Sequence, residues 1–129
     1  MTLGYWMILA AGLVPYLATG YAKFAAGGGR TYDNNAPRAN LDHLPPARLR
    51  AHWAQLNGFE AFPPFAAAVI VAHLAGATQC WIDGLAGAFV ALRVTYTLLY
   101  IYDKPTLRSV VWLAALLCVM GLFVAAAAG

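Results

Sequence analysis

The sequence predicts an all-α membrane protein, a four-transmembrane-helix bundle of up-and-down topology. Hydrophobic residues make up 62% of the 129 residues and charged residues only 10%, whereas soluble domains carry about 25% charged residues. The chain also holds several apolar stretches close to the roughly 20 residues that a bilayer-crossing helix needs. Short connections separate most of them, and short connections join antiparallel neighbours. We therefore expect one membrane domain over residues 1–129.

The expected spans follow one another along the chain as Leu3–Ala22, Gln55–Ala77, Trp81–Tyr102 and Leu107–Ala128. The first span is interrupted only by Pro15. Because Lys23 follows its apolar run rather than preceding it, the segment does not resemble a cleaved signal peptide. An amphipathic extension from about Pro46 leads into the second span.

The connections between these spans carry turn-forming residues. Residues 25–46, AAGGGRTYDNNAPRANLDHLPP, form the one long loop and are rich in Gly, Pro, Asn and Asp. A tight turn is expected at residues 76–79, and a second at residues 102–106, YDKPT. These connections predict that consecutive helices run in opposite directions.

In this topology all eight basic residues fall at one end of the bundle: Lys23, Arg30, Arg38, Arg48, Arg50, Arg93, Lys104 and Arg108. By the positive-inside rule, that end is cytoplasmic and both chain termini lie on the outer side. Topology thus accounts for the net charge of +3. No basic stripe interleaved with aromatic residues lies on a soluble face, so we expect membrane lipids and no nucleic acid as partners.

The histidines and cysteines are His43, His52, His73, Cys80 and Cys118. None of them has the spacing of metal ligands, so we expect no metal site. The two cysteines fall at different depths, which argues against a disulfide. His73 and Asp83 are expected to pair near the outer turn.

Polar residues on the second span form a stripe. Asn57, Glu60 and Pro64 are spaced i, i+3 and i+7 and so share one helix face, with Arg50 two turns earlier on roughly the same face. Pro63 and Pro64 are expected to distort the helix beside this stripe. Ionisable groups within a membrane cost ~2.5–3.5 kcal/mol each on insertion scales, so such groups are functional candidates.

A second stripe on the third span has the same spacing, with Arg93, Tyr96 and Tyr100 at i, i+3 and i+7. Both stripes lie toward the cytoplasmic end, which predicts a shared pocket. One alternative is a Glu60–Arg93 ion pair that only fixes helix packing. Another is that the tyrosines belong to an interfacial aromatic belt. The number of polar groups exceeds what one ion pair requires, which favours a binding site.

Arg108 falls in the first turn of the fourth span, just after the YDKPT turn. A cation there opposes the helix dipole at a cost of ~0.3–1 kcal/mol. Snorkelling toward lipid headgroups is one explanation. The other is that Arg108 and the helix N-terminus together hold an anion, of which a thiolate is one example.

Three motifs carry a resemblance to a known family: RLRAHWAQLNGFEAFPPF, LRVTYTLLY and PTLRSV. With their order and the chain length, they resemble the MAPEG family, membrane-associated proteins of eicosanoid and glutathione metabolism. The helix-two signature R-x6-N-x2-E-x2-P-x-F is matched by Arg50, Asn57, Glu60, Pro63 and Phe65. The helix-three signature is matched by Arg93, Tyr96 and Tyr100, and Arg108 with Ser109 resembles the helix-four pair of the prostaglandin synthase members.

The resemblance implies a homotrimer that binds glutathione as co-substrate between neighbouring subunits, near the cytoplasmic face. Asn57 and Glu60 would hold the peptide, with Glu60 taking the α-amino group, and Arg93 would take a carboxylate. Many glutathione-using members carry an arginine where this chain has Trp53. Arg50, which is among the expected glutathione ligands, or Lys23 would compensate for the missing arginine.

The resemblance also implies the chemistry. Tyr96 and Tyr100 would line the site, Arg108 would stabilise the thiolate, and Ser109 is a second catalytic candidate. The expected function is a glutathione transferase or peroxidase acting on hydrophobic electrophiles dissolved in the bilayer. The alternative is a non-catalytic trimeric module that binds a lipid or an amphipathic anion, because the family includes a member of that kind.

Overall fold

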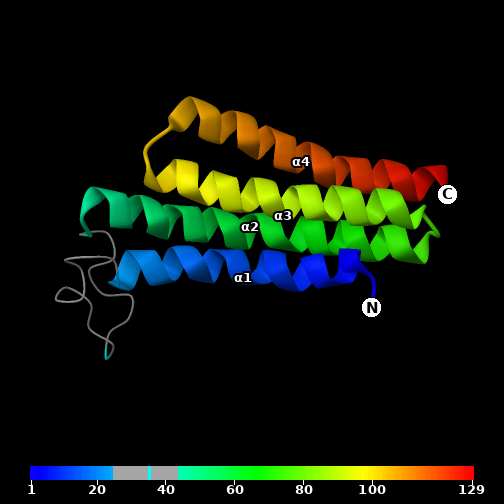
Figure 1. The fold of residues 1–129 in the computed structure, drawn as a ribbon, viewed down its shortest axis with the longest axis horizontal. Coiled ribbons are helices and arrows are strands. Elements are labelled where there is room, and N and C mark those ends of the chain that lie inside the picture. Colours follow the sequence, from blue (N-terminus) through cyan, green and yellow to red (C-terminus); the bar gives the residue numbers. More distant parts are fainter. Residues whose placement is uncertain (25–34, 36–43) are drawn as a thin grey trace.

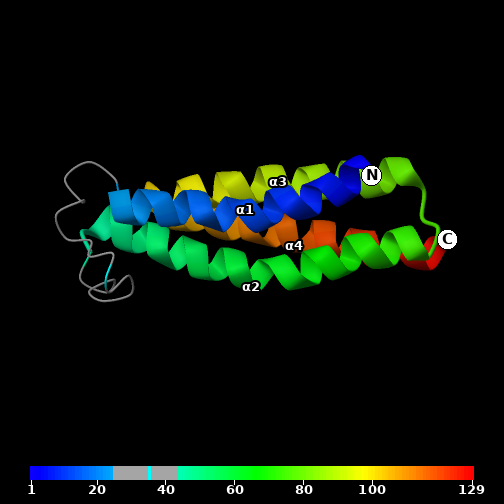
Figure 2. The same cartoon turned by 90° about the horizontal axis from the view of Figure 1, so that it is seen from below.

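The structure, a computed structural model, describes residues 1–24, 35 and 44–129. It contains four α-helices in these ranges: α1 Leu3–Phe24, α2 Pro46–Leu74, α3 Gln79–Ile101 and α4 Pro105–Ala128. Consecutive helices run in opposite directions along one long axis, and both chain termini lie at the same end of the bundle (Figures 1 and 2). The predicted all-α, up-and-down fold is confirmed, while most of the long loop lies outside the described residues.

The helix ends follow local chain chemistry and lie within a few residues of the predicted bounds. The α2–α3 turn contains Gly76 at φ +77°, a left-handed conformation that costs glycine nothing. Pro105 opens α4, where its missing N–H would have no partner within the helix. Pro63 and Pro64 lie inside α2, which continues through them as one helix.

The second and third helices form the centre of the bundle. Each of them packs against the other and against both α1 and α4, whereas α1 and α4, as described, do not contact each other. Phe65 of α2 stacks on Phe89 of α3 with ring centroids 4.0 Å apart. Small residues such as Ala68 and Ala86 are fully buried between the helices. Small side chains let helix backbones approach closely in a membrane, so this core suits a lipid environment.

Three of the described helices, α1, α3 and α4, are long and apolar enough to cross a membrane. Large apolar side chains remain exposed along them, including Leu17, Leu98 and Met120. The fourth expected span, in α2, is not among these three, because the first half of this helix carries Arg48, Arg50 and Glu60. Its polar residues are compatible with a membrane because α2 contacts each of the other helices.

Two arginines at the start of α2 bind the ends of its neighbours. The buried Arg48 donates from Nη2 to the carbonyl oxygen of Lys23, near the end of α1, at 2.7 Å. Arg50 donates from Nε and Nη2 to the carbonyl oxygen of Ile101, at the end of α3, at 3.2 and 2.9 Å. Carbonyls in the last turn of a helix have no partner within the helix and carry partial negative charge, so these bonds stabilise both ends.

At the opposite end, His73 and Asp83 bind the start of α1. Thr2 Oγ1 lies 2.7 Å from His73 Nε2, and the other ring nitrogen of His73 lies 2.8 Å from its own helix at the Val69 carbonyl. The Asp83 carboxylate accepts the Gly4 backbone N–H at 2.8 Å. The expected His73–Asp83 pair is therefore wrong, because the Thr2 hydroxyl is the partner of His73, and the Gly4 N–H at the helix start is a donor to Asp83.

Candidate functional site

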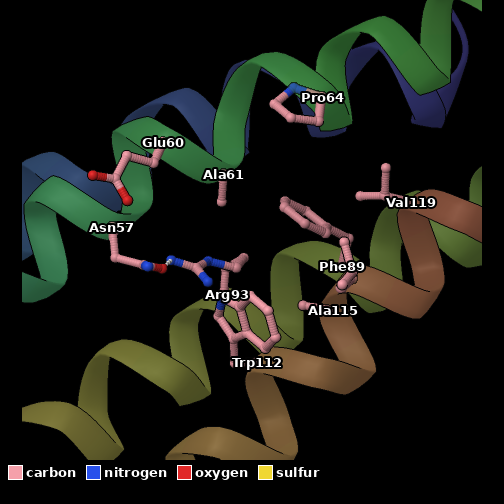
Figure 3. A pocket seen from close by; sticks show the side chains of 10 residues that line it. Asn57, Glu60, Ala61, Pro64, Phe89, Arg93, Trp112, Ala115 and Val119 are labelled. Carbon is pink, nitrogen blue, oxygen red and sulfur yellow. Dashed lines mark hydrogen bonds between the residues drawn. The ribbon is translucent and has the colours of Figure 1, made fainter.

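Two adjoining cavities lie between α2, α3 and α4, and Figure 3 shows the first of them. The first, here the Arg93 cavity, has a volume of about 220 Å³ and is bordered by Arg93 and Glu60. The second, here the Arg108 cavity, has a volume of about 230 Å³ and is bordered by Arg108. Asn57 and Trp112 line both cavities and so form their common wall. Together the cavities form one cleft toward the end of the bundle opposite the chain termini.

Arg93 is the most buried charged group of this cleft, with only 4% of its surface exposed. Its Nη2 donates to Asn57 Oδ1 at 2.7 Å, and the two side chains point toward each other from α3 and α2 (Figure 3). Its Cζ atom lies 4.2 Å from the centroid of the Tyr96 ring. An amide oxygen and an aromatic face stabilise a cation, but neither carries a full negative charge.

Glu60, the expected partner of Arg93 in the structural alternative, does not pair with it. The carboxylate forms no ion pair with Arg93 within the described part of the chain, where the guanidinium bonds to Asn57 instead. Glu60 is exposed and lines the mouth of the Arg93 cavity. Asn57 and Glu60 share one face of α2. The Arg93 side chain, which comes from α3, bonds to Asn57 and not to Glu60. The carboxylate of Glu60 is consequently accessible to a ligand.

Arg108 continues the row of cations and rings. Its Cζ atom lies 4.3 Å from the centroid of the Tyr100 ring. Tyr100 in turn meets Tyr96 edge to face, with centroids 5.7 Å apart. Because Tyr96 also supports Arg93, two guanidinium groups border one cleft with two tyrosine rings between them. The aromatic faces hold the arginine side chains beside the cleft without neutralising their charge.

Every predicted site residue except Arg50 lines one of the two cavities. Arg50 is used instead at the end of α3, through its bonds to the Ile101 carbonyl. Trp53 is 43% exposed and borders neither cavity. Ser109 joins Arg108 at the wall of the Arg108 cavity. The positions are thus consistent with the expected site, and the ligand roles remain predictions.

Two aromatic residues of the cleft were not identified from the sequence. Trp112 lies four residues after Arg108, and Phe89 lies four residues before Arg93. Residues four apart share a helix face, so the spacing from Arg108 and Arg93 could have indicated that Trp112 and Phe89 lie beside the cleft. Both are apolar residues in an apolar helix, however, and such residues are usually part of the packing. Only the cavity distinguishes them from their neighbours.

The charged groups of the cleft suit an organic ion with several charges. The part of the chain that the structure describes contains no cluster of three His, Cys, Asp or Glu side chains able to hold a metal. Two guanidinium groups suit carboxylates or a thiolate, and the Glu60 carboxylate suits an ammonium group. The cleft therefore has the charge pattern of a site for a zwitterionic, net-anionic ligand.

The fold and the cleft define a helical protein with membrane-compatible apolar helices and a cleft between α2, α3 and α4 that two arginines border. The chain belongs to the MAPEG family, whose family model matches residues 3–128. It is therefore a membrane protein of the family of glutathione and eicosanoid metabolism, as the three motifs predicted. Comparisons with curated proteins and with solved structures returned no match.

The Asn57–Arg93 bond gives a first prediction. Asn57→Ala removes the hydrogen bond of a buried cation, so the free energy of unfolding should fall by about 1.5–3 kcal/mol. Asn57→Asp keeps an acceptor and adds a charge, so it should restore most of that loss. Thermal unfolding in mild detergent, followed by circular dichroism, measures both changes. The matched control is Gln55→Ala, which removes an amide that borders neither cavity, and equal losses at positions 55 and 57 would contradict the proposed role of the bond.

Proposed function

We propose that this protein is a membrane-bound glutathione transferase or glutathione-dependent peroxidase, which activates the glutathione thiol for attack on hydrophobic electrophiles. One observation carries the proposal above all: the buried Arg93 has an amide and an aromatic ring as partners but no carboxylate among the described residues. A buried cation in an apolar bundle is costly unless an anion joins it. Glutathione carries two carboxylates, one α-ammonium group and one thiol, and so supplies the missing charges.

The peptide part of glutathione is assigned to the Arg93 cavity. One carboxylate binds the Arg93 guanidinium, which remains hydrogen-bonded to Asn57. The α-ammonium group binds Glu60, whose carboxylate is exposed at the cavity mouth. Asn57 accepts the Arg93 bond through its oxygen, so its amide NH₂ group is left to donate to the peptide. These contacts fix one end of the ligand by charge and leave its cysteine free to extend into the neighbouring cavity.

The thiol is assigned to the Arg108 cavity. A free thiol is mostly protonated at neutral pH, and a nearby cation lowers its pKa. Arg108 lies in the first turn of α4, where unpaired backbone N–H groups also favour an anion. The thiol proton passes to solvent, and Arg108 stabilises the thiolate. With an aryl halide, the sulfur forms a bond to the ring carbon, the carbon–halogen bond breaks, and the halide leaves with the bonding pair.

Assembly and orientation are part of the proposal. We expect a homotrimer, which the family resemblance implies, and the exposed apolar faces of α1 and α4 suit contact with lipid or with other subunits. We expect the cleft to lie near the cytoplasmic side, since the positive-inside rule assigns the basic end of the bundle to that side. Hydrophobic electrophiles or lipids would then reach the cleft from the bilayer.

A second candidate function is supported by Trp53. Many glutathione-using members carry an arginine at this position, and here an indole is 43% exposed on α2. A non-catalytic module that binds a lipid or an amphipathic anion would not need that arginine. The two candidates differ in one property, since only the enzyme must lower the pKa of the bound thiol.

Glu60 tests the binding part of the proposal. Glu60→Gln removes the partner of the α-ammonium group, so the dissociation constant of glutathione should rise by about tenfold or more, as for a lost charged hydrogen bond. The melting temperature should stay within a few degrees, because Glu60 is exposed and unpaired with Arg93 in the described chain. Titration calorimetry of the detergent-purified protein measures the first quantity and circular dichroism the second.

Asp103→Asn is the matched control for Glu60→Gln. It removes one carboxylate from the exposed α3–α4 turn, outside both cavities, and asparagine tolerates the φ of 59° found there. Glutathione affinity should be unchanged in this control. An unchanged affinity in Glu60→Gln would remove Glu60 from the site.

Substitutions of Arg108 test the proposed activation of the glutathione thiol. Arg108→Leu should raise the pKa of bound glutathione toward that of the free thiol while leaving much of the affinity, since Arg93 and Glu60 hold the peptide. Arg108→Lys should give an intermediate pKa, because the charge remains and the planar guanidinium is lost. Ultraviolet absorbance of the thiolate, followed against pH at saturating glutathione, reports this pKa. Lys104→Leu, which removes a cation from the exposed turn before α4, is the control for overall charge.

A parent protein that binds glutathione and leaves its thiol pKa at the free value would favour the binding module. An Arg108→Leu protein with the same bound-thiol titration as the parent would reject Arg108 as the thiolate stabiliser, whatever the overall activity.

A further inference from the structure

Helix α1 contributes no residue to either cavity, since the described residues that line them belong to α2, α3 and α4. It nevertheless packs against α2, the helix that carries Asn57 and Glu60. This contact contains two residues that helix interiors usually avoid. Pro15 lies inside α1, and Gly58 lies inside α2, directly after Asn57. Both residues destabilise a helix interior, so contacts with other helices must offset that cost.

The Pro15 ring is one of the most deeply buried side chains of the bundle. Without an N–H group, Pro15 cannot donate to the carbonyl of Ala11 one turn earlier, and interior prolines bend helices for this reason. The hydroxyl of Thr19 donates to the Pro15 carbonyl at 3.0 Å, a bond that also favours bending. Because the ring is closed on the backbone, it cannot swing aside as a flexible side chain would. Pro15 is therefore a rigid contact on the surface of α1 that faces α2.

Gly58 lets the backbone of α2 pack directly on this ring. A Cβ atom at position 58 would lie 2.8 Å from Pro15 Cγ and 3.3 Å from Pro15 Cβ, closer than non-bonded carbon atoms normally pack. Only a residue without a Cβ atom fits at this separation. The neighbouring residues Tyr16 and Phe59 also meet, edge to face with ring centroids 5.5 Å apart. The close contact of α1 with α2 therefore extends beyond the Pro15–Gly58 pair.

The Pro15–Gly58 contact lies behind the ligand site. At 3.6 residues per turn, Gly58 points about 160° away from Glu60 and about 100° away from Asn57 around α2. Helix α1 thus supports α2 from the side opposite the cleft. Asn57 bonds to Arg93 Nη2 at 2.7 Å across the α2–α3 contact. Because hydrogen bonds weaken quickly with a change in distance or angle, a small shift of α2 would weaken this bond.

We propose that Pro15 and Gly58 are positioning residues of the ligand site. Their contact holds α2 at the distance where Asn57 bonds to Arg93 and Glu60 lines the cavity mouth. They border neither cavity and act only through α2. The part of this inference that concerns glutathione rests on the proposed function, whereas the part that concerns the Asn57–Arg93 bond does not. Helix α1 thereby takes part in the site without contributing a residue to it.

Two substitutions, alone and together, test the contact. Gly58→Ala should push α2 away from the proline ring, so the dissociation constant of glutathione should rise by roughly tenfold. Adding Pro15→Ala removes Cγ, and the atom of residue 15 nearest the new methyl group is then Cβ at 3.3 Å instead of Cγ at 2.8 Å. The double variant should therefore bind glutathione within about threefold of the parent. Gly84→Ala is the matched control, because a Cβ atom there meets nothing within 4 Å, and it should leave the affinity unchanged.

A measurement without glutathione separates this inference from the proposed function. Asn57→Ala should lower the melting temperature of the parent by several degrees, because it removes the bond to Arg93. In the Gly58→Ala protein that bond is already weakened, so Asn57→Ala should lower the melting temperature by about half as much or less. The full effect should return in the Pro15→Ala/Gly58→Ala protein. Gln55→Ala, at a position that borders neither cavity, should have the same effect in all three proteins.

The outcomes are distinct. A reduced Asn57→Ala effect in Gly58→Ala that returns in the double variant would support the positioning role, even in a protein that does not bind glutathione. Such a protein would reject the proposed function alone. Glutathione affinity that Gly58→Ala leaves unaltered, together with a full Asn57→Ala effect, would overturn the positioning role and keep the proposed function. A loss that the double variant does not restore would reject the contact with Pro15 as its cause.

Pro15→Ala decides alone if Gly58→Ala does not fold. It removes the ring on which α2 packs and leaves a gap beside Gly58, so α2 is no longer held at its distance. The drop in melting temperature caused by Asn57→Ala should then be smaller than in the parent. An undiminished drop in the Pro15→Ala protein would reject the inference.

Discussion

The arrangement of the cleft depends on a single buried cation, the guanidinium of Arg93. It lies inside a bundle whose other buried side chains are almost all apolar, and a charge in such surroundings must find polar partners or destabilise the fold. Asn57 provides one hydrogen bond and Tyr96 provides an aromatic face. Because these partners come from α2 and α3, satisfying Arg93 also fixes how the two central helices face each other. No carboxylate is among the described partners of Arg93, so an anionic ligand can neutralise its positive charge.

The helix that supplies Asn57 is also the least apolar of the four. α2 binds the ends of α1 and α3 through Arg48 and Arg50, and it presents Glu60 to the cleft. These polar residues lower the mean hydropathy of α2 below that of the three candidate spans. Its contacts with every other helix keep part of its surface away from lipid. Several polar residues of the bundle thus lie on α2, which, like α3, contacts every other helix. The apolar helices α1 and α4 lie on the outside, with apolar surface for lipid or for other subunits.

Sequence reasoning predicted the helices and most of the cleft, because both depend on spacing along one chain segment. Apolar runs predicted α1, α3 and α4 to within a few residues, and intervals of three placed Asn57 with Glu60 and Arg93 with Tyr96. It did not identify which of these residues meet. The alternative of a Glu60–Arg93 pair is not found and the expected His73–Asp83 pair is wrong, because the rotation of one helix against another is set by packing rather than by spacing. Arg50 was misplaced for a related reason: a long side chain reaches several acceptors, and the Ile101 carbonyl lay nearest. Trp112 was missed because an indole in an apolar helix is usually a packing residue, and the sequence does not show the cavity beside it.

The most direct test of the account is the effect of glutathione on the thermal stability of the Arg93→Met protein. A ligand that binds only the folded state raises the melting temperature, and saturating glutathione should raise that of the parent by several degrees. Methionine is apolar and of similar length, so the bundle should still fold without the buried charge. If Arg93 holds a ligand carboxylate, Arg93→Met should remain folded and lose most of the glutathione-induced rise. A folded Arg93→Met protein that gains the same rise as the parent would contradict the central claim.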